Sequence, residues 1–200
     1  MDDIVRQAMA KWPNVPHCYG WLALDARGNW RMRDEAAQRQ HEPGERIANA
    51  TLQGFIHRNY THDDAGRWYF QNGPQRVYID LEVAPYVART DPAQGFVLHT
   101  GQALGSPDAA WLTASGRLLL RAQDKLVALD DRDLAAITPD FQLDGAALGD
   151  EQLLEWLADQ APRPLEWHIG ERRLAVERIP DTGLDARFGF VSRPREEALG

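Results

Sequence analysis

Apolar and polar residues alternate most regularly between residues 66 and 83. Alternation with a period of two predicts strands whose side chains point to opposite faces of a sheet. Asn72-Gly73 interrupts this stretch with a strong turn signal, so we expect an antiparallel hairpin. The predicted inward face consists of Val77, Ile79, Leu81 and Val83. The opposite face, predicted to meet solvent, consists of Tyr78, Asp80 and Glu82.

Two other segments repeat their apolar residues with the spacing of a helix. The first is predicted to begin at Asn49, a favourable N-cap, with an apolar face of Leu52, Phe55, Ile56 and Tyr60. The second is predicted to begin near Asp150 and to end before Pro162. Its apolar face consists of Leu153, Leu154, Trp156 and Leu157.

Shorter elements fill the rest of the chain. A packing helix is predicted near the N-terminus, ended by Pro13 and Pro16. Strands are predicted at 21–25 and 29–33 around the turn 26–28, and at 111–114 and 117–121 around Ser115-Gly116. A further strand is predicted at 125–129, followed by a short helix at 131–137.

The chain contains a degenerate internal repeat. Residues 66–80 align without a gap with residues 163–177, so that Phe70 meets Trp167 and Gly73 meets Gly170. A predicted helix precedes both segments. We therefore expect an α+β fold with two similar halves, each a helix covering a mostly antiparallel sheet. The predicted organisation is an N-terminal helix (1–16), a first subdomain (17–92), a linker (93–108), a second subdomain (109–191) and a solvated tail (192–200).

Composition narrows the classes of protein. The chain has 200 residues, of which 44% are hydrophobic, and a net charge of −8, which disfavours nucleic-acid partners. One cysteine excludes a disulfide framework and a cysteine-rich zinc site. Apolar runs are too short to cross a membrane, and no signal peptide is recognised. Arginine far outnumbers lysine, as in proteins of GC-rich bacterial genomes, so we expect a bacterial, cytoplasmic protein.

Three segments carry a resemblance to a known class of protein: GWLALDARGNW (20–30), ATLQGFIHRNY (50–60) and GRWYFQNGPQRVYIDLEVAPYV (66–87). Together they resemble uncharacterised proteobacterial domain-of-unknown-function families over roughly residues 17–90. The resemblance implies an α+β fold in two subdomains and supplies no activity and no catalytic residue.

No arrangement of reactive residues matches a known catalytic motif. His57, His62, Asp63 and Asp64 are the nearest to a metal-ligand cluster, but their spacing suits a polar loop, so no metal and no cofactor are expected. His17-Cys18 are neighbours in an extended segment, where side chains point apart, so Cys18 is expected to be a partly buried thiol. Neither the serines (Ser106, Ser115 and Ser192) nor the carboxylate pair of Asp80 and Glu82 has a supporting motif.

The first half carries polar and aromatic groups that the second half lacks. The candidate ligand-binding residues are Arg58, Asn59, Tyr60, Asn72, Gln75, Arg76 and Tyr78. Cap, turn and sheet-packing chemistry explains the same residues without a ligand. The sequence therefore favours a non-enzymatic binding or regulatory protein, with a small-molecule or protein-partner surface at the junction of the subdomains. The alternative is an enzyme with a site around Arg58, Tyr60, Arg76 and Tyr78.

Overall fold

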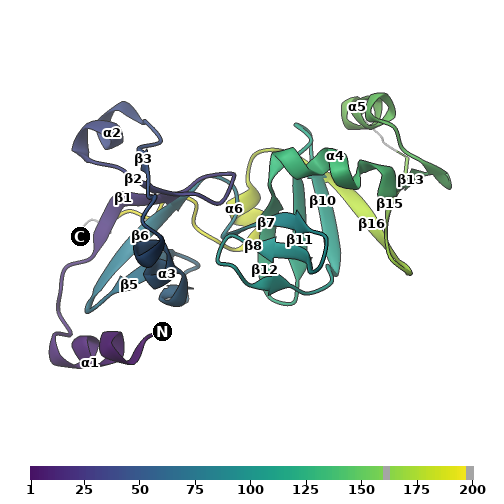
Figure 1. Cartoon of the computed structure of the whole chain (residues 1–200). Coiled ribbons are helices and arrows are strands. Elements are labelled where there is room, and N and C mark those ends of the chain that lie inside the picture. The colour runs from purple at the N-terminus through teal and green to yellow at the C-terminus, as the bar shows by residue number, and fades with distance from the viewer. Residues whose placement is uncertain (160–162, 197–200) are drawn as a thin grey trace. The chain divides into compact units, whose positions relative to one another are not determined.

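The computed structural model describes residues 1–159 and 163–196 (Figure 1). The α+β class is confirmed: helices accompany two mixed sheets, which have six and ten strands among the described residues. The first unit comprises Met1–Asp25, Asn29–Pro85 and the described residues from Asp185 onward. The second unit comprises Ala26–Gly28 and the described part of Tyr86–Leu184. None of the described helices is long and apolar enough to cross a membrane.

The sheet of the first unit has the order β3-β2-β1-β6-β5-β4. Its strands are β1 (Cys18–Leu24), β2 (Trp30–Met32), β3 (Glu45–Arg46), β4 (Tyr60–His62), β5 (Trp68–Asn72) and β6 (Gln75–Leu81). The central strands β1 and β6 are parallel, and the other pairs are antiparallel. The predicted hairpin is therefore correct, and β6 has a strand on each side of it.

Three helices accompany this sheet: α1 (Asp3–Lys11), α2 (Glu35–Gln40) and α3 (Ala50–Arg58). The carboxamide of Asn49 accepts the Leu52 backbone N–H at 2.9 Å, which confirms the predicted N-cap. Helix α3 packs Phe55 edge-on against Phe70 of β5, with ring centroids 5.3 Å apart. It ends at Arg58, so Tyr60 belongs to β4, and Leu52 is exposed rather than part of the packed face.

The second unit contains the larger sheet, with the order β14-β13-β15-β16-β10-β11-β12-β7-β8-β9. The first six strands of this sheet in chain order are β7 (Tyr86–Asp91), β8 (Gly95–Leu98), β9 (Ala103–Leu104), β10 (Ala109–Thr113), β11 (Leu118–Ala122) and β12 (Lys125–Leu129). They are followed by β13 (Phe141–Leu143), β14 (Ala146–Ala147), β15 (Leu165–Ile169) and β16 (Arg172–Ile179). Strand β10 is parallel to β16, and β12 is parallel to β7.

Short helices connect these strands: η1 (Asp131–Asp133), α4 (Leu134–Ile137), η2 (Thr138–Asp140) and α5 (Asp150–Ala158). The predicted helix at 131–137 is therefore present as η1 and α4. Helix α5 buries Leu153, Trp156 and Leu157, whereas Leu154, predicted on the same face, is 67% exposed. The predicted end of this helix at Pro162 lies outside the described residues.

The predicted solvent face is wrong for Tyr78 and Asp80, whereas Glu82, directly after β6, is exposed as predicted. Tyr78 is 1% exposed and Asp80 is 5% exposed, while Ile79 on the predicted core face is fully buried. Helix α3 packs on one face of this sheet, where Phe55 contacts Phe70, and on the opposite face Tyr19 stacks on Tyr78. The side chains of Arg33 and Arg195 form ion pairs with Asp80 on the same face as Tyr78.

The predicted linker and tail also differ from the structure. Residues 93–108 contain β8 and β9, which extend the second sheet, and the boundary between units lies at Pro85 instead. Near the C-terminus, helix α6 (Leu184–Phe188) leads to a segment of the first unit. There the Leu81 N–H donates to the carbonyl of Ser192 at 2.8 Å. Residues 190–196 therefore contact the sheet, and residues 197–200 lie outside the described part.

The two sheets share a strand order at their centres. In each, a parallel pair (β1 with β6, β10 with β16) has an antiparallel hairpin on either side. A helix precedes the hairpin in both cases, but β4 follows its helix whereas β13 precedes its own. Equivalence of the two halves residue by residue remains a prediction.

Candidate functional site

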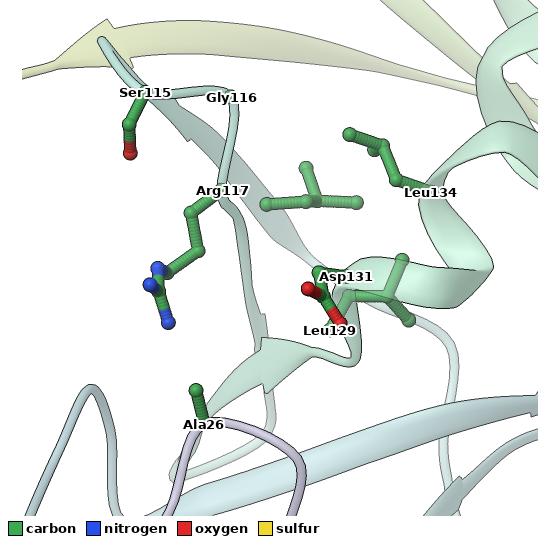
Figure 2. A pocket seen from close by; sticks show the side chains of 8 residues that line it. Ala26, Ser115, Gly116, Arg117, Leu129, Asp131 and Leu134 are labelled. Atoms are coloured by element: carbon green, nitrogen blue, oxygen red, sulfur yellow. The ribbon is translucent and has the colours of Figure 1, made fainter.

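The second unit contains a pocket of about 270 Å³ beside the turn between β10 and β11. Its walls are Ala26, Ser115, Gly116, Arg117, Leu118, Leu129, Asp131 and Leu134. Figure 2 shows Ser115 and Arg117 on one side, with Asp131 and Leu134 on the other. We call this cavity the leucine pocket.

The apolar part of the leucine pocket comes from three neighbouring elements. Leu118 begins β11, Leu129 ends β12 and Leu134 begins α4. Leu118 and Leu129 are 2% and 3% exposed, so only a small part of each side chain faces the cavity. Close packing against the surrounding side chains fixes the positions of Leu118 and Leu129 in the absence of a ligand.

The turn that forms the polar side is held by its own hydrogen bonds. Gly116 has a φ of +84°, a conformation that glycine adopts without steric cost. The hydroxyl of Ser115 donates to Oδ1 of Asp181 at 2.5 Å and lies 3.1 Å from Oγ1 of Thr113. The Ser115 hydroxyl, together with further hydrogen bonds from this turn, lowers the pKa of the Asp181 carboxyl against the opposing effect of burial.

On the other side, Asp131 forms an ion pair with Arg27. The Nε and Nη2 atoms of Arg27 lie 3.1 and 3.2 Å from the two carboxylate oxygens. The hydrogen bond from Arg27 to Asp131 is also the main reason why the pKa of Arg27 is raised. The charge of Asp131 is therefore neutralised within the rim of the pocket.

Arg117 differs from the other charged groups of the leucine pocket. Its backbone N–H donates to Oγ1 of Thr113 at 3.2 Å, which orients the residue. Arg117 is half-buried, and across residues 1–159 and 163–196 no carboxylate lies within ion-pair distance of its guanidinium. Its charge nevertheless contributes to lowering the pKa of Asp181 from a longer distance. The donors of this side chain are available to a ligand.

The candidate residues predicted from the sequence lie in the first unit and separate into several places. Arg58 forms an ion pair with Asp2 at 3.2 Å, and Asn59 is buried and accepts the Asp2 backbone N–H at 2.8 Å. Both residues therefore connect α3 to α1. The hydroxyl of Tyr60 donates to the carbonyl of Pro85 at 2.7 Å. These contacts explain all three side chains as structural.

Arg76 and Tyr78 do lie together, in an aromatic cluster on the face of the sheet opposite α3. Tyr78 stacks on Tyr19 with centroids 4.7 Å apart, and its hydroxyl donates to Oδ2 of Asp63 at 3.1 Å. The guanidinium of Arg76 lies 4.7 Å above the ring of Tyr69. Arg58 and Tyr60, in contrast, contact Asp2 and the carbonyl of Pro85.

The two remaining candidate ligand-binding residues are Gln75 and Asn72. The amide of Gln75 donates to the carbonyl of Pro16 at 3.0 Å, and Asn72 is exposed at the end of β5. Cys18 is half-buried, as predicted, and burial raises the pKa of its thiol. Burial also lowers the pKa of His17, with the charges of Arg76 and Arg67 acting in the same direction.

The residues considered as metal ligands are used otherwise. Asp63 accepts Nε of Arg67 at 2.8 Å, and Nδ1 of His62 lies 2.9 Å from the carbonyl of Asp63. Burial lowers the pKa of His57, which favours its neutral form. The described residues contain no group of three or more His, Cys, Asp or Glu side chains placed to hold a metal ion.

The leucine pocket was not predicted from the sequence. Ser115-Gly116 was recognised only as a turn, and that assignment is correct. Leu129 and Leu134 are assigned to a strand and a helix by their patterns, but no pattern indicates that they face one cavity. The unpaired state of Arg117 depends on the positions of acidic residues far away in the sequence.

The sequence places the chain in a family of unknown activity. A family model described as "Protein of unknown function (DUF2946)" matches residues 1–195. The chain belongs to this family. The predicted resemblance to an uncharacterised domain family is thereby confirmed.

One solved structure can be compared with the fold of this chain. The chain is similar to the crystal structure of a DUF1285 family protein from Silicibacter pomeroyi, with 11% sequence identity and a TM-score of 0.46. The similarity covers 76% of this chain and 98% of that chain. No curated protein matches the sequence.

Proposed function

We propose that this protein binds a small organic molecule reversibly in the leucine pocket. The observation that carries the proposal is a cavity of about 270 Å³ with buried leucines on one side and polar groups at its rim. Small-molecule sites are typically concave and apolar, with a few polar groups that orient the ligand. This volume is just below the usual range for drug-sized ligands, so the ligand is a small metabolite.

A thermal-shift screen with small metabolites tests this function. A ligand that binds only the native state at about a hundred times its Kd adds roughly 2.7 kcal/mol to the free energy of unfolding. The melting temperature then rises by several degrees. Leu134→Trp fills the cavity and abolishes the shift, whereas Leu154→Trp, at an exposed position of α5, leaves it intact. A screen without any stabilising molecule contradicts the proposal, as does a shift that survives Leu134→Trp.

The wider sequence-based expectations form part of the same proposal: a bacterial, cytoplasmic, non-enzymatic protein with no nucleic-acid partner. The net charge of −8 and the single cysteine support it. Fractionation of the native host tests the location. A DNA-binding assay at low salt tests the partner class, and tight binding there is the contradicting result.

The internal repeat also belongs to the proposal. The shared central strand order supports it, as do the hairpin turns at Gly73 and Gly170, with φ values of +56° and +58°. Superposition of β5–β6 on β15–β16 tests it. Coincidence of the two glycines and of Ile79 with Val176 is the expected result, and a shift of register contradicts it.

A further inference from the structure

We propose that the ligand of the leucine pocket is a small monocarboxylate whose carboxylate pairs with Arg117 and whose apolar body lies on the leucines. This inference rests on the proposed function and adds the chemical class of the ligand. The donors, acceptors and charges around the cavity support this ligand class, as does the volume of the cavity.

The acidic groups near the pocket already have partners. Asp131 accepts two hydrogen bonds from Arg27, at 3.1 and 3.2 Å. Asp181 accepts the Ser115 hydroxyl at 2.5 Å and the Ser115 backbone N–H at 3.3 Å. Neither carboxylate forms an ion pair with Arg117 within the part of the chain that the structure describes.

The hydroxyl groups of the turn offer little to a ligand. Ser115 uses its only proton for Asp181, because a carboxylate can only accept a hydrogen bond. Thr113 accepts the Arg117 backbone N–H and lies 3.1 Å from the Ser115 oxygen, so it can donate its own proton there. The turn is therefore satisfied internally, and strong donation on this side of the pocket comes from the Arg117 guanidinium.

A guanidinium without an acceptor selects for a planar anion. Its parallel N–H groups match the two oxygens of a carboxylate and form charge-assisted hydrogen bonds with them. A dianionic phosphate carries more charge than one guanidinium balances, and the nearby Asp181 carboxylate, which accepts hydrogen bonds from the neutral Ser115, repels the excess. One carboxylate therefore suits the electrostatics of the pocket better than a phosphate group.

The leucine side chains of the pocket wall determine the chemistry of the part of the ligand that is not the carboxylate. Leu118, Leu129 and Leu134 provide apolar contact with no hydrogen-bonding atom, so a second polar group would lose its hydration there without compensation. A volume of about 270 Å³ limits the apolar body to a short branched chain or a single ring. Suitable probes are 4-methylpentanoate and phenylacetate.

Titration calorimetry on the full chain tests the inference with each acid and its uncharged primary amide. The amide has nearly the same shape but no negative charge, so we expect the acid to bind the native protein at least tenfold more tightly. Arg117→Gln removes the charge and brings the acid-to-amide ratio close to one. The matched control is Arg172→Gln, at an exposed position of the β15–β16 hairpin that is not part of the pocket wall, and it retains the ratio.

The outcomes separate this inference from the proposed function. Equal affinity of the native protein for acid and amide overturns the carboxylate and leaves small-molecule binding intact. Tighter binding of inorganic phosphate than of either acid, lost in Arg117→Gln, overturns the ligand class in the same way. Failure of acids, amides and every molecule of the thermal-shift screen overturns both. The comparison of acid with amide uses the native protein, so it remains decisive if Arg117→Gln does not fold.

Discussion

Tyr78 illustrates how much a single side chain contributes when both faces of a strand are covered. It is 1% exposed, stacks on Tyr19 and donates a hydrogen bond to Asp63. We expect Tyr78→Ala to lower the free energy of unfolding by about 3–5 kcal/mol, comparable to the ~2–5 kcal/mol of Ile79→Ala. Tyr78→Phe removes only the hydroxyl and costs about 1 kcal/mol. Urea denaturation measures all three, and a cost for Tyr78→Ala near that of Tyr78→Phe would contradict the assigned packing.

Asp63 makes the stability of the first unit depend on pH. Burial alone raises the pKa of this carboxyl, but hydrogen bonds from Arg67 and Tyr78 outweigh that effect and lower it. A carboxyl whose pKa is lower in the folded state stabilises the fold above its unfolded pKa, near 3.9. That contribution disappears as the pH falls through the folded pKa.

Asp63→Asn should therefore destabilise the protein most at neutral pH. The difference from the native protein should shrink as the pH falls below about 4, because protonation removes the same charge. Urea midpoints between pH 3 and pH 7 measure this difference. A difference that does not change with pH would show that the charge of Asp63 contributes nothing.

At the scale of elements, Asp80 adds ion pairs to the backbone hydrogen bonds that hold the segment 190–196 on the first sheet. Asp80 is 5% exposed and forms ion pairs with Arg33 and with Arg195, whose Nη1 lies 2.8 Å from Oδ1. Arg195 is largely exposed, so Arg195→Ala should cost only about 1 kcal/mol. Asp80→Asn removes the buried carboxylate that pairs with the half-buried Arg33 and should cost roughly 3–5 kcal/mol. Equal costs in denaturant unfolding would contradict this assignment.

Helix α3 depends on a single cap at its start. The side chain of Asn49 accepts the Leu52 backbone N–H, which otherwise has no partner within the helix. Asn49→Ala should lower the free energy of unfolding by about 1 kcal/mol, whereas Asn49→Asp preserves the acceptor and most of the stability. Thermal unfolding distinguishes the two, and equal melting temperatures of the two variants would argue against a capping role.

At the scale of the whole molecule, the two units differ in chain continuity. The large hydrophobic cluster that includes Leu112, Leu120 and Trp167 lies entirely within residues 86–184. The first unit, in contrast, is assembled from separate stretches of the chain. We expect a fragment of residues 86–184 to fold alone, since it retains this core.

Near-ultraviolet circular dichroism and urea unfolding of that fragment test its independence. A native-like aromatic spectrum and a cooperative transition are expected. The fragment lacks the turn that carries Arg27, so its stability should be somewhat lower than that of the same region in the full chain. A fragment without cooperative unfolding would show that this core needs the rest of the chain.

The local pattern of residues determined most elements of this protein. Alternation predicted the β5–β6 and β10–β11 hairpins, and Asn49 predicted the start of α3, because these features depend on neighbours within a few residues. The same reasoning predicts a linker at residues 93–108, since β8 and β9 are short and are surrounded by the turn-forming residues Pro92, Gly101, Gly105 and Pro107. A resemblance to an uncharacterised domain family is also recognisable from motifs that follow one another along the chain, and the family model confirms it.

Only the tertiary structure decided which faces are covered and which charges are paired. Tyr78 and Asp80 alternate with core residues as a solvent face does, yet Tyr19, Arg33 and Arg195 cover them from distant parts of the chain. Arg117 is available to a ligand because no carboxylate of the folded unit, within the described residues, reaches it. Such properties depend on long-range contacts, and periodicity within one segment carries no information about its partners.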